Sequence, residues 1–233
     1  MKKQLWNKYT ESAYQTSSWS GGTTTQLAIE PEGAAYGDRD FLWRLSSARV
    51  DLPHSVFTAL PDYDRIIAPL EGSLVMKCGE SPCFSLAPLE LCAFDGAAET
   101  ESWGKCRDFN LMLRKGKCRG AVQALRLLSG ATLQWTPPVL SGSLQAHSVN
   151  LLQKQAAIYC VSGSVTLACG GEVLEAAAGE LLFCKMFEAW RAAESGQAPV
   201  GEASVETAPF PEEGVQLSSG QGAVLMAALV EVS

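Results

Sequence analysis

The sequence of 233 residues is 47% apolar and 18% charged, the balance of a globular protein, which excludes an intrinsically disordered chain. The formal net charge of −7 and the absence of a run rich in Lys and Arg argue against a nucleic-acid partner. The N-terminal segment lacks the apolar stretch of a signal peptide and no window could span a bilayer, so we expect a cytoplasmic protein without a membrane partner.

Short apolar runs recur between clusters of Gly, Pro, Asp and Ser, a pattern typical of β-strands. Residues 118–128 are the best candidate for a helix. The eight cysteines include no CxxC pair, so we interpret them as small buried side chains and not as zinc ligands. A contact between Cys78 and Cys83 across a hairpin is the alternative.

The first distinctive segment, residues 19–26, reads WSGGTTTQ. Paired glycines permit backbone conformations in which several N–H groups converge on one point, as in an anion-binding loop. A hairpin turn that enters a Thr-rich strand explains the same residues equally well.

Residues 41–48 predict a strand with two unlike faces. One face carries Phe41, Trp43 and Leu45, and the other carries Leu42, Arg44, Ser46 and Ala48. An arginine among apolar neighbours must reach water or pair with an acid, for which Asp64 and Asp108 are candidates. Such an arginine offers a planar fork to a carboxylate ligand, or it forms a plain structural ion pair.

A repeat relates residues 66–94 to residues 157–183. In each copy an apolar strand reaches a glycine, Gly72 or Gly163, and a second strand, a Gly-containing turn and a further apolar strand follow. Two copies of one β unit indicate two tandem barrels. This pattern resembles cupins, so we predict an all-β bicupin: two small β-barrels of the double-stranded β-helix or jelly-roll type, packed together. Residues 1–115 and 116–233 would form the two barrels, with a long exposed loop near 188–221.

The last strands of the two copies differ in polarity. In residues 107–113, alternation places Asp108, Asn110 and Met112 on one face, whereas residues 222–229 carry no polar pair. Two polar residues on one strand face need partners, water or a ligand. They line a functional cavity or lie on a solvated face.

The sequence argues against metal-dependent cupin chemistry, because it contains only His54 and His147 and no HxH pair. We therefore expect no metal site and no cofactor. No Gly-x-Ser-x-Gly elbow is present, and we name no catalytic residue. Proton transfer by His54 with an acidic partner stays open beside the plainer interpretation of a surface histidine.

Several segments together resemble the HutD/Ves family of bicupins, which is associated in many bacteria with histidine utilisation. They are residues 19–24, 40–48, 56–65, 70–72 and 108–112, in the family's order, and they cover roughly the first half of the chain. The resemblance implies a first-barrel cavity lined by Trp19, Thr24, Arg44, Ser46, Arg65, Asp108 and Asn110.

The same resemblance implies a protein that binds a small carboxylate metabolite, such as a formylglutamate-like compound, and modulates histidine catabolism. One alternative is a metal-independent isomerase or hydrolase, in which Asp108 and His54 would act together. Another is a structural or partner-binding barrel with an exposed apolar patch in place of a polar pocket. A monomer and a homodimer are both compatible with the sequence.

Overall fold

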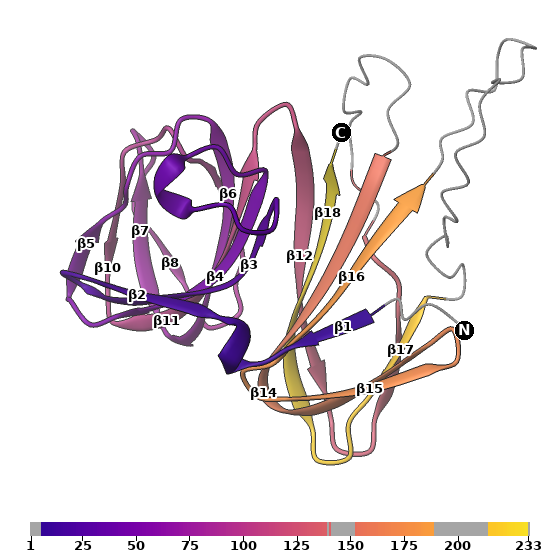
Figure 1. Cartoon of the computed structure of the whole chain (residues 1–233). Coiled ribbons are helices and arrows are strands. Elements are labelled where there is room, and N and C mark those ends of the chain that lie inside the picture. The colour runs from indigo at the N-terminus through magenta and orange to yellow at the C-terminus, as the bar shows by residue number, and fades with distance from the viewer. Residues whose placement is uncertain (1–5, 139, 141–151, 189–213, 233) are drawn as a thin grey trace, which may run out of the picture.

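The computed structural model describes residues 6–138, 140, 152–188 and 214–232 (Figure 1). Their regular structure is almost entirely β, and the described ranges contain no α-helix. Two 3-10 turns, η1 (Glu11–Ala13) and η2 (Tyr36–Asp38), interrupt the strands. No helix in these ranges is long and apolar enough to cross a membrane.

The first barrel is built from two sheets. The six-stranded sheet has the order β2-β3-β4-β11-β6-β9, and the four-stranded sheet has the order β5-β10-β7-β8. The strands are β2 (Gln15–Trp19), β3 (Gly22–Glu30), β4 (Trp43–Val50), β5 (His54–Val56), β6 (Tyr63–Gly72), β7 (Leu74–Cys78), β8 (Phe84–Leu86), β9 (Cys92–Asp95), β10 (Thr100–Trp103) and β11 (Cys106–Arg114). Between the sheets, Ile67 from the larger packs with Leu74 and Met76 from the smaller.

The second barrel contains β12 (Cys118–Leu127), β13 (Thr132–Trp135), β14 (Leu152–Cys169), β15 (Glu172–Ala177), β16 (Leu181–Glu188), β17 (Val215–Ser218) and β18 (Ala223–Val232). The N-terminal strand β1 (Trp6–Tyr9) pairs with β16, and Trp6 is buried in this second core. An N-terminal strand thus belongs to the sheet of the second barrel. The division of the chain into two domains at residue 115 stays a proposal.

The barrels share a large apolar interface between the outer faces of β4 and β11 and the strands β14, β16 and β18. Trp43 lies against Phe183 with 5.7 Å between ring centroids, and Phe109 stacks on Tyr159 at 6.1 Å. Burial of these aromatic rings on both sides favours a fixed packing of the two barrels.

The repeat has a structural counterpart in two glycines at equivalent places. Gly72 and Gly163 have φ values of +75° and +76°, and each precedes a close approach to the last strand of its barrel. A Cβ atom on Gly72 would lie 2.5 Å from the carbonyl oxygen of Lys105, and one on Gly163 would lie 2.0 Å from that of Gly222. Both positions therefore require glycine for conformation and for space.

One expectation from the sequence is wrong, and another lies mostly outside the described residues. Residues 118–127 form strand β12 and not a helix, because all ten pair with β18 and Gly120 lies close to the carbonyl oxygen of Leu229. In the expected loop near 188–221, residues 189–213 lie outside the described ranges, but Val215 and Leu217 alternate into the second core as part of β17. All eight cysteines are free, so Cys78 and Cys83 are not linked, and five of the eight are buried as predicted.

Candidate ligand-binding cavity

A cavity of about 600 Å³ opens inside the first barrel, between the six-stranded sheet and β5. Its volume is in the usual range for small-molecule sites. The cavity wall includes all seven residues named from the sequence: Trp19, Thr24, Arg44, Ser46, Arg65, Asp108 and Asn110. The residues that the family resemblance implied thus line one cavity, and their part in ligand binding stays a prediction.

The cavity is polar because two adjacent strands turn their polar faces inward. Arg44 and Ser46 of β4 alternate with Trp43 and Leu45, which belong to the interface between the barrels. In the register of β11 against β4, Asn110 lies opposite Ser46. The predicted alternation holds from Trp43 onward. Its extension to Phe41 is wrong, because that residue precedes the strand and stacks on Tyr63 instead.

Arg44 is buried and its guanidinium is held by neutral groups. Its Nε donates to Oε1 of Gln26 at 2.8 Å, and Nη1 donates to Oγ of Ser46 at 3.2 Å. The guanidinium also lies over the ring of Tyr36, 4.4 Å from the centroid. Burial lowers the pKa of Arg44 to about 10.

Arg65 is likewise buried, and its guanidinium lies against two aromatic rings. Its guanidinium carbon lies 4.9 Å from the ring centroid of Phe57 and 5.1 Å from that of Phe94. The Nε atom has no hydrogen-bond partner among the described residues. Burial lowers the pKa of this arginine as well.

Asp108 is the buried carboxylate of the cavity, but it forms a salt bridge with neither arginine. Its Oδ1 accepts a hydrogen bond from the backbone N–H of Ala48 at 2.9 Å. Burial raises the pKa of Asp108 to about 6, and Arg65 and Arg44 oppose this rise. Asp64, the other expected partner of Arg44, is exposed. The structure therefore does not contain the expected structural ion pair between Arg44 and either Asp64 or Asp108.

The paired glycines of residues 19–26 form a hairpin turn, as one of the two interpretations expected. Trp19 pairs with Gly22, and β2 and β3 run antiparallel from there. The indole of Trp19 lies over Gly21, where a Cβ atom would meet the ring at 2.0 Å. Trp19 thereby becomes part of the cavity wall while 40% of its surface stays exposed.

His54 belongs to the cavity wall, but its imidazole is engaged elsewhere. Its Nε2 donates to Oε2 of Glu101 at 2.7 Å, and the ring stacks on Trp103. In β10, Thr100 and Ser102 are buried, so Glu101 and Trp103 lie on the opposite, outer face. A pair of His54 with Asp108 is not formed. His147 lies outside the described ranges.

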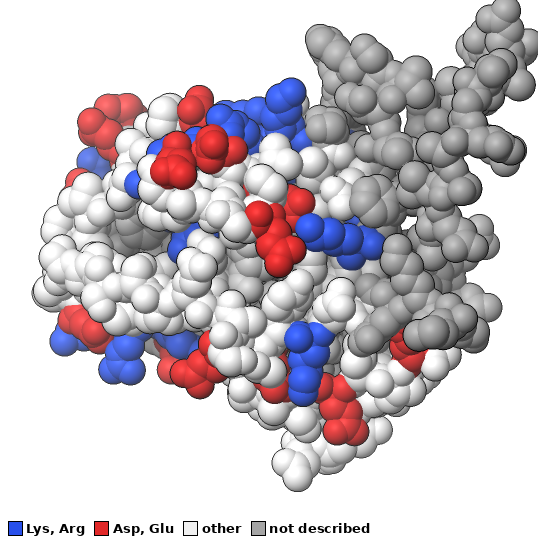
Figure 2. Space-filling model, viewed as in Figure 1, with Lys and Arg blue, Asp and Glu red and all other residues white. Residues whose placement is uncertain are grey.

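Sequence reasoning missed the aromatic and amide residues that hold the two guanidiniums: Gln26, Tyr36, Phe57 and Phe94. Gln26, Phe57 and Phe94 lie in segments with a visible pattern, whereas Tyr36 lies in none. In the described ranges no group of three or more His, Cys, Asp or Glu side chains is placed to hold a metal ion. On the face seen in Figure 2, acidic and basic side chains of the described residues are interspersed.

Comparison with known proteins decides the family, because the model of the HutD family matches residues 11–198. The chain belongs to the HutD family. It is 30% identical over 172 residues to the protein Ves of Cronobacter sakazakii, a match that covers 71% of this chain and 88% of that protein. The predicted HutD/Ves resemblance is thus confirmed.

Solved structures support the fold of this HutD-family chain. HutD from Pseudomonas fluorescens SBW25 matches with a TM-score of 0.63 at 18% identity, over 98% of this chain and 100% of that one. A conserved protein of unknown function from Pseudomonas aeruginosa PAO1 matches with a TM-score of 0.69 at 20% identity, over 97% and 99% of the two chains. An oxalate decarboxylase from Bacillus subtilis, at 7% identity, matches with a TM-score of 0.58 over 98% and 77%. The predicted bicupin fold is confirmed.

Proposed function

We propose that this protein binds a small carboxylate metabolite in the first-barrel cavity, without a metal ion or other cofactor, and thereby modulates histidine catabolism. The observation that carries the proposal is the pair Arg44 and Arg65. Both guanidiniums are buried in one cavity, and neither forms a salt bridge with a carboxylate among the described residues.

Charge balance supports an anionic ligand. A buried charge without a partner is unfavourable by several kcal/mol, and a carboxylate that enters the cavity relieves that cost. Asp108 offsets only part of the positive charge, because it supplies at most one negative charge against two guanidiniums and burial raises its pKa to about 6. A guanidinium also offers two parallel donors that match a carboxylate.

The other polar groups suit a ligand with more than one functional group. The Oδ1 atom of Asn110 is buried and unpaired among the described residues, and Asp108 has a further carboxylate oxygen. Both accept hydrogen bonds, so an N–H or O–H group beside the carboxylate would be recognised. A formylglutamate-like compound carries both kinds of group. The link to histidine catabolism rests on the HutD family alone.

A thermal-shift screen with glutamate, formylglutamate, urocanate and histidine tests the proposal. One of the carboxylates should raise the Tm saturably, with a stabilisation of about 2.7 kcal/mol at a concentration of 100 Kd. Arg44→Met and Arg65→Met should each abolish the shift, whereas Arg126→Met on the exposed surface of β12 should retain it. A shift that survives in both cavity variants contradicts the proposal.

Two further readouts separate the remaining possibilities. NMR spectra of the bound compound should stay unchanged over hours, because the protein binds it without turnover; product formation would favour a metal-independent isomerase or hydrolase. Deletion of the gene in its host should alter growth on histidine and leave growth on ammonium unchanged. Equal growth on both would remove histidine catabolism from the proposal.

A further inference from the structure

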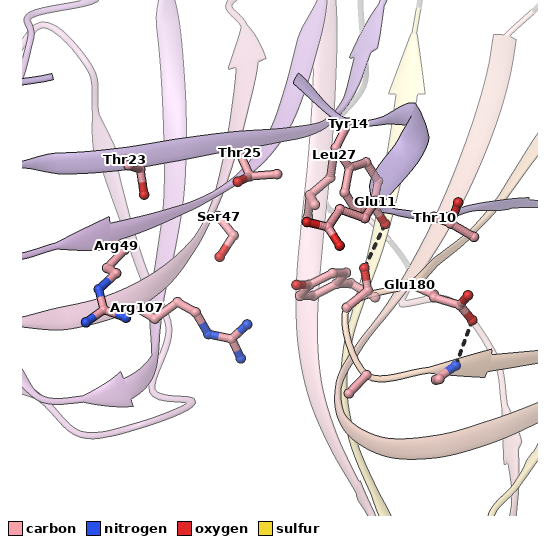
Figure 3. Close-up of a pocket in the computed structure, with 14 residues that line it drawn as sticks. Thr10, Glu11, Tyr14, Thr23, Thr25, Leu27, Ser47, Arg49, Arg107 and Glu180 are labelled. Atoms are coloured by element: carbon pink, nitrogen blue, oxygen red, sulfur yellow. Dashed lines mark hydrogen bonds between the residues drawn. The ribbon is translucent and has the colours of Figure 1, made fainter. Parts of the chain in front are cut away.

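A second pocket, of about 430 Å³, lies between the two barrels (Figure 3). One wall is the outer face of the first-barrel sheet, and the other comprises Tyr159 of β14, the turn between β15 and β16, and the segment around η1. Consecutive residues of β3 and of β4 face different sites, because side chains alternate across a strand. Thr24 and Ser46 line the first cavity, whereas Thr25 and Ser47 line this inter-barrel pocket.

One wall of the inter-barrel pocket is cationic. Arg49 of β4 bonds to Asp51 at 3.0 Å, and Arg107 of β11 bonds to Glu71 at 2.9 Å. Both acidic partners are largely exposed, with 56% and 69% of their side-chain surface accessible. Such surface ion pairs contribute little, so a ligand carboxylate can replace these partners at small cost.

The opposite side of the pocket offers one available carboxylate, that of Glu11. Figure 3 shows its side chain pointing into the space between the barrels, and no described residue forms a hydrogen bond or ion pair with its carboxylate. Glu180 is engaged already, because it accepts from the backbone N–H of Ala177 at 2.8 Å and pairs with Lys8 at 3.3 Å.

Hydroxyl groups lie between the two charged sides. Thr23, Thr25 and Ser47 point from the first-barrel sheet into the pocket (Figure 3). The hydroxyl of Thr25 also bonds to that of Thr16 at 2.9 Å, and the hydroxyl of Ser47 donates to the carbonyl oxygen of Asp108. Tyr14 fixes the second wall, since its hydroxyl donates to the carbonyl oxygen of Gly179 at 3.0 Å. The pocket thus has a cationic side, a hydroxyl-rich middle and an anionic side.

We propose that the inter-barrel pocket binds a small zwitterion, a free α-amino acid. The α-carboxylate faces Arg49 and Arg107, and the α-ammonium faces Glu11. A simple anion would meet the negative charge of Glu11, and a simple cation would meet two guanidiniums, so only a molecule with both charges is complementary to both sides. This proposal does not depend on the function of the first-barrel cavity.

A panel of the twenty free L-α-amino acids tests the proposal by ligand-observed NMR on the full chain. At least one should bind saturably, and its deaminated and decarboxylated analogues should each bind about tenfold more weakly or worse. A carboxylate analogue that binds as tightly as the amino acid overturns the zwitterion assignment, as does a panel in which nothing binds.

Variants locate the site. Glu11→Gln and Arg49→Met alter exposed side chains, so both should fold, and each should weaken amino-acid binding about tenfold or more. Glu32→Gln, an exposed change elsewhere, should leave binding unaltered. Binding that survives Glu11→Gln and Arg49→Met, or that is lost in Glu32→Gln, overturns the proposal.

Discussion

Arg107 and Asp108 are adjacent in β11, yet they line different sites. A register irregularity between them interrupts the pairing of β11 with β6. Arg107 lines the inter-barrel pocket, and Asp108 lines the first-barrel cavity. Ser47 of β4 fixes this arrangement, because its hydroxyl donates to the carbonyl oxygen of Asp108 at 2.6 Å. One strand therefore positions charged groups on both sides of a single sheet.

We predict that Arg65→Met stabilises the unliganded protein. Arg65 is buried without a salt bridge, so its desolvation costs several kcal/mol, and an apolar side chain of similar length removes that cost. Urea unfolding of the unliganded protein measures the change. A loss of more than 1 kcal/mol would mean that this arginine serves the fold and not a ligand.

Carboxylate binding should strengthen as the pH falls through about 6. Asp108 has a raised pKa of about 6, so it loses its negative charge in this range, while ligand carboxylates stay ionised. Calorimetric titrations between pH 5 and 7.5 measure this dependence. The Asp108→Asn variant should bind with little dependence on pH over the same range, and an unchanged pH profile in that variant would point to another group.

The same carboxyl group affects folding stability. Its pKa in the folded protein is above the ordinary value of 3.8, so the folded state binds a proton more tightly than the unfolded state does. Asp108 therefore lowers stability as the pH rises from about 4 to about 6. Urea midpoints of the wild type and of Asp108→Asn should diverge over that range, with the wild type losing stability relative to the variant. Parallel midpoints would contradict the assigned shift.

Truncation of Trp6 should reduce folding stability, whereas truncation of Trp19 should mainly reduce ligand binding. Trp6→Ala should destabilise the protein by about 3–5 kcal/mol, because its side chain is buried in the second core. Trp19→Ala should change stability little, since the indole is partly exposed, but it should weaken ligand binding in the first cavity. Denaturation and binding measured on both variants check this. A mild effect of Trp6→Ala would mean that β1 is dispensable.

Glycine at position 72 should be required for space as well as for conformation. Gly72→Ala places a Cβ atom 2.5 Å from a carbonyl oxygen, whereas Gly116→Ala, at the similar φ of +72°, meets nothing within 4 Å. The control variant Gly116→Ala should lose about 1–2 kcal/mol of folding stability from left-handed backbone strain alone, and Gly72→Ala should lose more. Equal losses of stability would show that the backbone adjusts easily.

The sequence predicted the wall of the cavity well because strand alternation is a local property. In residues 107–113 and 43–46, apolar and polar residues alternate, and one face lies in the barrel interface while the other faces the cavity. The family resemblance added Trp19, Thr24 and Arg65, which alternation alone does not single out.

Features that depend on distant partners could not be predicted. Residues 118–127 form a strand because β18 supplies their hydrogen bonds. The local sequence around residues 118–127 does not indicate that β18 is their partner. Tyr36 reaches Arg44 from a short 3-10 turn, and Phe94 reaches Arg65 from another strand. The pairing of His54 with Glu101 likewise joins residues of two strands. Each contact joins residues that only the closed barrel brings together.

The most direct test of the central claim is a crystal structure of the protein grown with a carboxylate that raises its Tm. The proposed function predicts that carboxylate's oxygens within hydrogen-bond distance of the guanidiniums of Arg44 and Arg65, inside the first barrel. A carboxylate bound outside this cavity, or a first-barrel cavity that holds only water under saturating ligand, would contradict it.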